Sequence, residues 1–448
     1  MRLHQEYRAL FCAVGVAWAF GASAATAAEL GGEAVPVERL LTDTGALSAW
    51  LQAHQPEVFA AAARVEQANA LVEQSRVIPN PTLSVAVGGL TVGDRNPTSL
   101  AYGDTMNVSV GVSELVELGK RGPRARSAEL RRSAARASAR DVVAEKLSDA
   151  RDAIARVVYV RERGRVLEER LRSAKNVAAL EQVRLEHGDI SGIDHDRLEL
   201  DAAAAAREVA ESQADLESAM ADCSTLLLAP CAPGESTMAI VDAAAPLPPA
   251  FGDVGERIHT RPDVQAALLG GEAARSDATL YRRQALPDPT FGLTYTKDYL
   301  VAAGNQANTL TASVSIPLPL FDHGQHLSRF AEGQARELDF QARALETRAL
   351  SEARALLARR EVLMGKLDAL SRFAIPRADA VLKSSDDAYH HGQLSLTDLL
   401  IVRREHASLL LDAIDTRYEL FTVRNTLHRT LGIGVPTTPP PLPASRTR

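Results

Sequence analysis

The sequence predicts a mixed fold of long helices and membrane-spanning β-strands that is built twice in one chain. Three observations predict it. The segment HGDISGIDHDRL (187–198) resembles HGQLSLTDLLIV (391–402), with His, Gly, Ser and Asp recurring at a constant offset of 204 residues. Pro-Asn-Pro and Pro-Asp-Pro sequences each introduce segments with strict two-residue alternation, and helical patterns of about 65 residues follow them. A period of roughly 200 residues is typical of tandem duplication rather than of a small solenoid repeat.

Residues 1–27 have the form of a secretory signal peptide. Arg2 and Arg8 flank a short basic region, an apolar stretch follows at 10–22, and 25–27 form a small-residue cleavage site. After cleavage, Cys223 and Cys231 are the only cysteines that remain. Because exported proteins mature in an oxidising compartment, we expect a disulfide between them, with two unpaired thiols as the alternative.

The first repeat, residues 28–228, is predicted to contain a helix, two strands and a long helical hairpin. Pro56 interrupts the first helix early, and Pro123 suits the first position of the long helix. Gly188 lies at the hairpin tip, where glycine supplies the left-handed end of a helix. The predicted elements are a helix at 45–77, strands near 82–87 and 106–113, and helices at 123–186 and 194–228.

The second repeat, residues 259–432, has the same order of parts, with its hairpin tip at Gly392. Pro376 lies inside its long helix, whereas the matching position of the first repeat is Arg172, so only the second long helix should kink. The predicted strands lie near 291–296 and 309–316, and the helices at 325–390 and 396–431. Residues 229–258 are predicted to be a linker, and the Pro-rich residues 433–448 a disordered tail.

Each hairpin tip carries a serine and an aspartate after its glycine. Ser191 and Asp194 in the first tip, and Ser395 and Asp398 in the second, are spaced to cap the returning helices. Local capping alone would explain these residues.

The predicted strands have one apolar face and one face of small hydroxyl residues and glycines. A soluble sheet would cover the apolar face with a helix, whereas a barrel wall would turn it toward lipid. The signal peptide and the two matching strand pairs favour the barrel. The residues expected to face lipid are Leu83, Val85, Val108, Val110, Leu293, Val314 and Ile316.

Two strand pairs give four strands per chain, which are too few to close a barrel. An open sheet edge in lipid would leave backbone groups unsatisfied, so other chains must complete the wall. Three chains would supply twelve strands, within the even-numbered range of bacterial barrels, and twelve helices to continue the wall.

Composition excludes several classes of function. The net charge is −7 and no basic stripe is present, which disfavours nucleic-acid binding. No nucleophile–base set or phosphate-binding loop is apparent, so we expect neither an enzyme nor a cofactor. Aromatic residues make up only 4% of the chain, as suits thin helical layers packed through Ala and Leu.

Over residues ~40–432 the sequence resembles the TolC-type outer-membrane efflux proteins. The resemblance rests on the duplicated plan, Asn80-Pro81 and Asp288-Pro289 at the strand starts, Arg261-Pro262-Asp263 opening the second repeat, and the paired Gly-to-Asp tips. It implies a trimeric, twelve-stranded outer-membrane β-barrel, with four strands per chain, continued by a long periplasmic α-helical barrel. It also implies four partners: two further copies of the chain, outer-membrane lipid, a periplasmic membrane fusion (adaptor) protein, and an inner-membrane efflux pump of the resistance-nodulation-division type.

Within that family the sequence most resembles the CzcC-like heavy-metal branch. Glu117-Leu118-Gly119-Lys120-Arg121 is similar to the Glu-Leu-Gly-Gly-Lys-Arg stretch of that branch, with one glycine fewer. The resemblance implies heavy-metal cations as the cargo. A duct of the same fold for drugs or other small molecules is the main alternative. A periplasmic coiled-coil adaptor or scaffold is another, although an adaptor should have a single hairpin between the halves of split domains.

Four histidines, His187, His195, His390 and His391, flank the two tips. Threefold symmetry would gather them near the entrance, where imidazoles are able to bind transition metals. The simpler interpretation is solvated or contact-forming tip residues, which we favour because a passive duct should not hold its cargo tightly. His323 and His326, at a strand-to-helix junction, receive the same interpretation. The resemblance further implies that Asp194 and Asp398 of three chains form a ring of six carboxylates that attracts cations.

Overall fold

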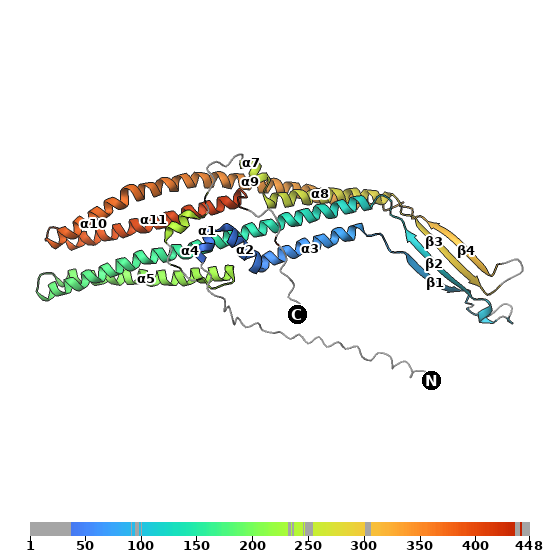
Figure 1. The fold of residues 1–448 in the computed structure, drawn as a ribbon, viewed down its shortest axis with the longest axis horizontal. Helices are drawn as coiled ribbons and strands as arrows, with labels where there is room; N and C mark the ends of the chain where they lie inside the picture. Colours follow the sequence, from blue (N-terminus) through green and yellow to red (C-terminus); the bar gives the residue numbers. More distant parts are fainter. Residues whose placement is uncertain are drawn as a thin grey trace, which may run out of the picture.

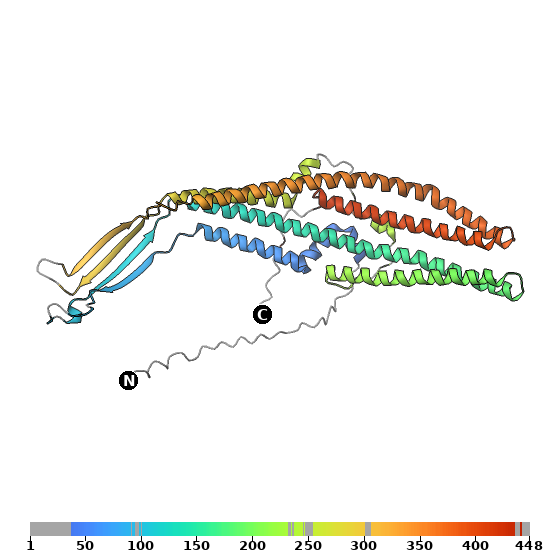
Figure 2. The same cartoon turned by 180° about the vertical axis from the view of Figure 1, so that it is seen from behind.

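The computed structural model describes residues 37–90, 92–94, 98–99, 101–231, 234, 237–244, 246, 254–300, 306–434 and 440. The chain is elongated, with a four-stranded sheet at one end and the tips of two helical hairpins at the other (Figure 1, Figure 2). The expected signal peptide and almost all of the expected disordered tail lie outside the described residues. Among the described residues, none of the helices has the length and hydropathy that crossing a membrane requires.

The first repeat opens with a helix that is divided where the sequence predicts. Pro56 has no N–H to donate and begins a new helix, while Gln55 before it is extended. The long helix begins at Arg121, two residues before the predicted start at Pro123, because the first turn of a helix needs no N–H partner and accepts proline. The elements are α1 (Val37–Thr42), α2 (Thr44–His54), α3 (Pro56–Arg76), β1 (Thr82–Gly88), β2 (Asn107–Leu115), α4 (Arg121–Glu186) and α5 (Gly192–Leu227), with a short 3₁₀ helix at Tyr102–Asp104.

The second repeat has the same order, preceded by a segment that is more than a linker. Residues 229–258, predicted as a plain linker, include α6 and most of α7. Met238 and Val241 of α6 are fully buried, so this segment is part of the core. The elements are α6 (Met238–Ala243), α7 (Val254–His259), α8 (Pro262–Arg282), a 3₁₀ turn (Arg283–Ala285), β3 (Thr290–Asp298), β4 (Asn308–Ser315), α9 (Gln325–Ala369), α10 (Ile375–His390) and α11 (Leu396–Thr430).

Only the second of the two long helices is interrupted, as the position of Pro376 predicts. A π-helical segment, Leu370–Ala374, separates α9 from α10, and Pro376 follows in the first turn of α10. Because proline cannot donate to the carbonyl four residues earlier, the wider π turn absorbs the break. In the first repeat α4 runs through Arg172 without interruption for 66 residues.

The sheet is antiparallel and its strands follow chain order, β1-β2-β3-β4. Val85 pairs with Val110, Val110 with Tyr295, and Tyr295 with Leu310, so one row of apolar side chains crosses all four strands. The opposite face carries small residues such as Gly111, which lies opposite Ser84 and Thr294. The predicted two-faced strands are therefore confirmed.

The sheet projects beyond the helices, and within the described part of the chain no helix covers either face (Figure 1, Figure 2). The alternative of a soluble sheet covered by a helix is therefore wrong. Leu83, Val85, Val110, Leu293 and Val314 are exposed, as a lipid-facing surface requires. Val108 is only half-buried, and Ile316 lies one residue beyond β4, where it is still exposed.

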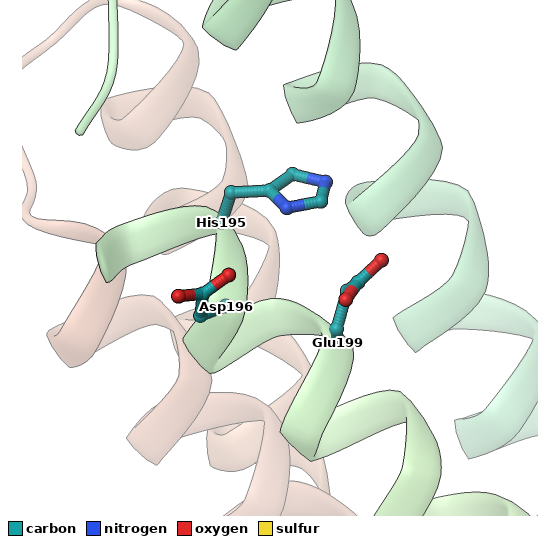
Figure 3. Close-up of side chains that lie close together, drawn as sticks. All are labelled: His195, Asp196 and Glu199. Atoms are coloured by element: carbon teal, nitrogen blue, oxygen red, sulfur yellow. The ribbon is translucent and has the colours of Figure 1, made fainter. Parts of the chain in front are cut away.

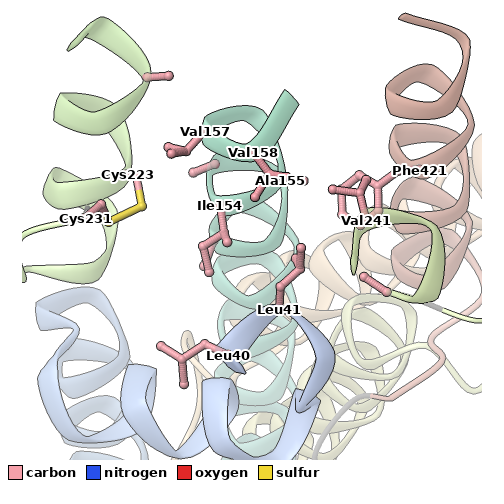
Figure 4. Close-up of a cluster of buried hydrophobic side chains, with 14 of the residues drawn as sticks. Leu40, Leu41, Ile154, Ala155, Val157, Val158, Cys223, Cys231, Val241 and Phe421 are labelled. Carbon is pink, nitrogen blue, oxygen red and sulfur yellow. A yellow bond between two sulfur atoms is a disulfide. The ribbon is translucent and has the colours of Figure 1, made fainter. Parts of the chain in front are cut away.

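The main core lies halfway along the molecule, where α1, α2 and α6 pack against α4, α5 and α11 (Figure 4). Phe421 is its largest fully buried side chain, and Leu41, Ile154 and Val241 belong to the same cluster. The Trp50 indole N–H donates to the carbonyl of Leu227 at 2.9 Å, which ties α2 to the end of α5. Elsewhere the long helices pack mainly through alanines, which explains the low aromatic content.

Candidate functional site

The hairpin tips end their outgoing helices with the same backbone geometry. Gly188 and Gly392 have φ angles of +80° and +72°, in the left-handed region that favours glycine. The Gly188 N–H donates to Leu185 O at 2.9 Å and the next N–H, of Asp189, to Arg184 O at 2.8 Å. The second tip repeats both bonds. These two hydrogen bonds satisfy carbonyl groups in the last turn of each long helix, and the chain reverses direction there.

The returning helices are capped by serine. The Ser191 hydroxyl oxygen accepts from the Asp194 N–H at 3.1 Å, and its O–H donates to the Asp194 carboxylate at 2.8 Å. Ser395 and Asp398 repeat the arrangement at 3.2 Å and 2.7 Å. The predicted capping role of the aspartates needs correction, because serine occupies the N-cap position and its hydroxyl takes the backbone N–H. Each aspartate instead orients the serine from the third position of the helix.

The two tip aspartates differ in their electrostatic surroundings. Asp194 lies 3.5 Å from the guanidinium of Arg197 in the next turn. The position that matches Arg197 in the second repeat is Ile401, and Asp398 is exposed. The negative charge of Asp398 is therefore the less compensated of the two.

The structure does not bring the four tip histidines together within one chain. His187 and His391 are exposed, and each bonds through Nδ1 to a carbonyl of its own helix, four residues earlier, at 2.7 Å. His390 is exposed and lies 6.2 Å from the Tyr389 ring. His323 and His326 are exposed at the start of α9.

His195 is different, because it is buried and lies near two carboxylates. Its ring nitrogen and the carboxylate oxygens of Asp196 and Glu199 all lie within 4.8 Å of one another. Figure 3 shows His195 and Glu199 extending to the same side of α5, one turn apart. Imidazole and carboxylate groups suit borderline metals such as Zn²⁺ or Co²⁺. However, His195 matches Leu399, a buried packing residue of the second repeat, so packing alone also accounts for its position.

Side-chain contacts link the two hairpins just above the tips. Glu181 of α4 is almost completely buried, and it accepts hydrogen bonds from Arg184 and from the Tyr389 hydroxyl of α10. Burial, together with the bond to Glu181, raises the pKa of Tyr389 to about 12. Arg403 of α11 donates to Asp386 at 2.7 Å and to Ser173 of α4 at 3.0 Å. These contacts fix the spacing of the hairpins near their tips.

Sequence reasoning missed this group of residues. Glu181 and Tyr389 match Ser385 and Leu185 of the other repeat, so the duplication gives no hint of their contact. The pairing depends on how the hairpins lie side by side, which no local pattern encodes.

Cys223 and Cys231 are joined by a disulfide. Both are buried in the main core, where the bond fixes the chain as it leaves α5. Leu228 between them has a φ of 53°, the one positive value among described non-glycine residues. The bond thus closes a tight loop at the midpoint of the molecule.

The junction between β2 and α4 holds the stretch Glu117–Arg121. Lys120 forms an ion pair with Asp288 at 2.6 Å, and Asp288 also accepts from the Leu118 N–H at 2.9 Å. These bonds lower the pKa of the Asp288 carboxyl against the opposing effect of its burial. Glu117 pairs with Arg124 at 2.5 Å, and Gly119 turns the chain with a φ of +69°. The stretch therefore anchors the sheet to the helices.

Comparison with known proteins agrees with this geometry. Residues 47–222 and 255–433 match the family described as outer membrane efflux protein. The cobalt-zinc-cadmium resistance protein CzcC of Cupriavidus metallidurans is 25% identical over 380 residues, which cover 83% of this chain and 86% of CzcC.

Solved structures share the fold at lower identity. The MtrE outer membrane channel of Neisseria gonorrhoeae, in its open state, matches with a TM-score of 0.72 at 17% identity, covering 90% of this chain and 91% of MtrE. The CmeC outer membrane channel of Campylobacter jejuni matches with a TM-score of 0.71 at 14% identity, covering 88% and 86%.

An elongated chain with an open four-stranded sheet at one end and paired helical hairpins at the other has the fold of these outer-membrane channels. The chain belongs to the outer membrane efflux protein family. The expected fold class is confirmed: a trimeric β-barrel in the outer membrane, with four strands per chain, continued by a large periplasmic helical barrel. Family members are passive channels, so this chain is a channel rather than an enzyme, and the adaptor alternative does not fit.

Proposed function

We propose that the chain forms the outer-membrane duct of a tripartite efflux system for heavy-metal cations. Family membership supports the role as a duct. The direction of transport is inferred from one observation: the two hairpin tips lie at the opposite end of the chain from the sheet (Figure 1). With the sheet in the outer membrane, the tips face the periplasm and receive the cargo. The small hydroxyl and glycine residues of the inner sheet face then line the exit.

The proposed partners are a periplasmic membrane fusion protein at the tips and an inner-membrane pump of the resistance-nodulation-division type. Ile193, in the first turn of α5, is 68% exposed and supplies an apolar contact at the first tip. A photo-crosslinking residue at Ile193 should capture the fusion protein in cells. The same residue at Val92, 98% exposed at the sheet end of the chain, is the matched control and should not. Capture from Val92 alone would contradict the proposed orientation.

The proposed cargo rests on the similarity to CzcC, whose name links it to cobalt, zinc and cadmium resistance. The stretch Glu117–Arg121, which resembles that branch, makes structural contacts at the base of the sheet and is far along the chain from both tips. The stretch therefore supports a relationship to the CzcC-like branch, but its residues do not themselves select ions. A duct for drugs or other small molecules remains the second candidate.

The test is complementation of a strain that lacks this gene. Expression of the chain should restore growth in cobalt, zinc or cadmium salts and leave sensitivity to organic drugs unchanged. A chain with Val110→Arg, which should reduce barrel assembly, is the negative control and should restore less growth. Restored drug resistance without metal resistance would establish the alternative cargo.

A further inference from the structure

His195, near the start of α5, occupies a position that the other repeat fills with an apolar side chain. The matching residue, Leu399, is 1% exposed, and His195 itself is 9% exposed. Burying an imidazole is unfavourable unless a partner replaces the water that bonds to its ring nitrogens. Within the described part of the chain, no protein group forms a hydrogen bond to the His195 ring. A ring nitrogen is therefore available to a ligand.

Two carboxylates lie beside this imidazole. One oxygen each from Asp196 and Glu199, and a ring nitrogen of His195, all lie within 4.8 Å of one another. His195 and Glu199 are four residues apart and extend to the same side of α5 (Figure 3). A zinc ion lies about 2.0 to 2.2 Å from its nitrogen and oxygen ligands. Small side-chain rotations would therefore let one ion contact all three atoms.

The charges around these three residues favour a cation. The Asp196 and Glu199 side chains are exposed and each carries a negative charge at neutral pH. Arg197 is the only arginine or lysine in residues 192–200. Its guanidinium forms an ion pair with Asp194 at 3.5 Å. The one permanently positive side chain of this turn is therefore paired outside the cluster.

The second repeat shows that the hairpin fold does not require this combination. The residues that match His195, Asp196 and Glu199 at the offset of 204 are Leu399, Leu400 and Arg403. Leu399 packs in the interior, and Arg403 donates hydrogen bonds to side chains of α10 and α4. The two tips thus share their backbone and serine cap, but only the first carries three groups that can bind a metal ion.

We propose that His195, Asp196 and Glu199 form a binding site for a divalent transition-metal cation such as Zn²⁺ or Co²⁺. One imidazole nitrogen with two carboxylate oxygens suits these ions, whereas Mg²⁺ and Ca²⁺ prefer oxygen ligands. Two of the ligands are exposed and all three come from one helix, so a bound ion exchanges readily with water, as a duct requires. A role in transport rests on the proposed heavy-metal cargo, but binding itself does not.

Equilibrium dialysis of the tag-free, full-length trimer against zinc chloride tests the site. The native cysteines are joined and do not compete for zinc. The wild type should bind one more zinc ion per chain than His195→Leu, which introduces the side chain already present at the matching position. His187→Leu, which removes an exposed tip histidine, is the matched control and should retain this binding. Equimolar magnesium should not displace the zinc.

The carboxylates are tested by variants that keep their shape. Asp196→Asn and Glu199→Gln each remove one charge, and each should weaken zinc binding by about tenfold. The double variant replaces His195→Leu as the test if that chain does not form trimers, because both carboxylates are exposed. Zinc binding that is equal in the wild type and these variants, or that equimolar magnesium abolishes, would overturn the site.

Metal resistance of cells that carry the same variants reports transport separately. If the wild-type chain binds zinc at His195 but does not restore metal resistance, the proposed cargo is wrong and the binding site stands. If the wild type restores resistance and His195→Leu binds as much zinc as the wild type, the site is wrong and the cargo stands.

Discussion

At the residue scale, the two tips have the same backbone and differ in charge. Each uses a left-handed glycine and a serine N-cap, and the duplication preserved both. Arg197 accompanies Asp194, whereas Ile401 stands at the matching position beside Asp398. Residues required by backbone geometry were thus retained in both repeats, and neighbouring exposed side chains diverged.

This difference gives a prediction for ion passage. Asp398→Asn keeps an oxygen that accepts from the Ser395 hydroxyl, so the variant should assemble normally. It removes the less compensated of the two tip charges from the proposed entrance ring, and we expect weaker block by divalent cations in planar-bilayer recordings. Asp194→Asn is the matched control and should have a smaller effect. If divalent cations block both variants as strongly as the wild type, the aspartates serve only to orient the serine N-caps.

A second prediction concerns His195. Because Leu399 fills the matching position in the other hairpin, His195→Leu should fold and assemble, and it should raise the free energy of unfolding by about 1 kcal/mol by removing a buried polar group. Heat dissociation of trimers on gels measures this. Glu199→Gln, on the exposed side of the same cluster, is the control and should change little. Loss of trimers in His195→Leu would show that the imidazole is needed.

At the element scale, periodicity was sufficient for most of the fold. The two-residue alternation located all four strands, and Pro56, Gly188, Pro376 and Gly392 marked real breaks in the helices. These features are encoded locally, by backbone restrictions or by side-chain alternation. The packing role of α6 was missed because a six-residue helix has too few turns to show a pattern.

The disulfide at the end of α5 should stabilise the midsection. Closing a loop with a sequence separation of 8 residues is worth about 2.5 kcal/mol in the chain-entropy description. Replacing Cys223 and Cys231 together by alanine should lower the denaturant midpoint of the purified trimer accordingly. Mass spectrometry of unreduced peptides from the native chain provides the control. Two freely alkylated thiols there would disprove the bond.

The packing of α4 against α8 gives a prediction for pH. Burial, with the nearby charge of Asp263, raises the pKa of Asp141 from 3.8 to about 6, although Arg261 and Arg429 oppose the shift. A carboxyl whose pKa is higher in the folded state stabilises the fold most below pH 4, and this contribution is lost as the pH rises toward 6. Asp141→Asn should therefore stabilise the protein at pH 7, by about 3 kcal/mol, and flatten the pH profile between 4 and 6.

Denaturant unfolding of the trimer at several pH values measures this effect. Asp189→Asn, at an exposed tip position, is the matched control and should leave the profile unchanged. A profile for Asp141→Asn that parallels the wild type would mean that Asp141 is already solvated in the assembled channel.

At the scale of the whole molecule, each repeat contributes one strand pair to the sheet at one end and one helical hairpin at the other. The two strand pairs join into one sheet, and the two hairpins lie side by side along the periplasmic part (Figure 1). The sequence predicted this plan, and the need for other chains followed from counting strands. It did not predict the contact of Glu181 with Tyr389 between the hairpins. The residues that make this contact differ between the repeats, so neither the internal duplication nor the local sequence pattern predicts it.

The last prediction tests the placement of the sheet in lipid. Val110 lies in the middle of β2, between Val85 and Tyr295 on the apolar face, and Ser109 beside it faces the other way. Arginine on the lipid side near the bilayer midplane costs about 2 to 4 kcal/mol, whereas a lumen position leaves the charge in water. Val110→Arg should therefore reduce the yield of heat-resistant trimers in outer-membrane fractions, and Ser109→Arg should preserve it. The two substitutions add the same side chain to adjacent residues, so equal yields would mean that this face of the sheet does not contact lipid.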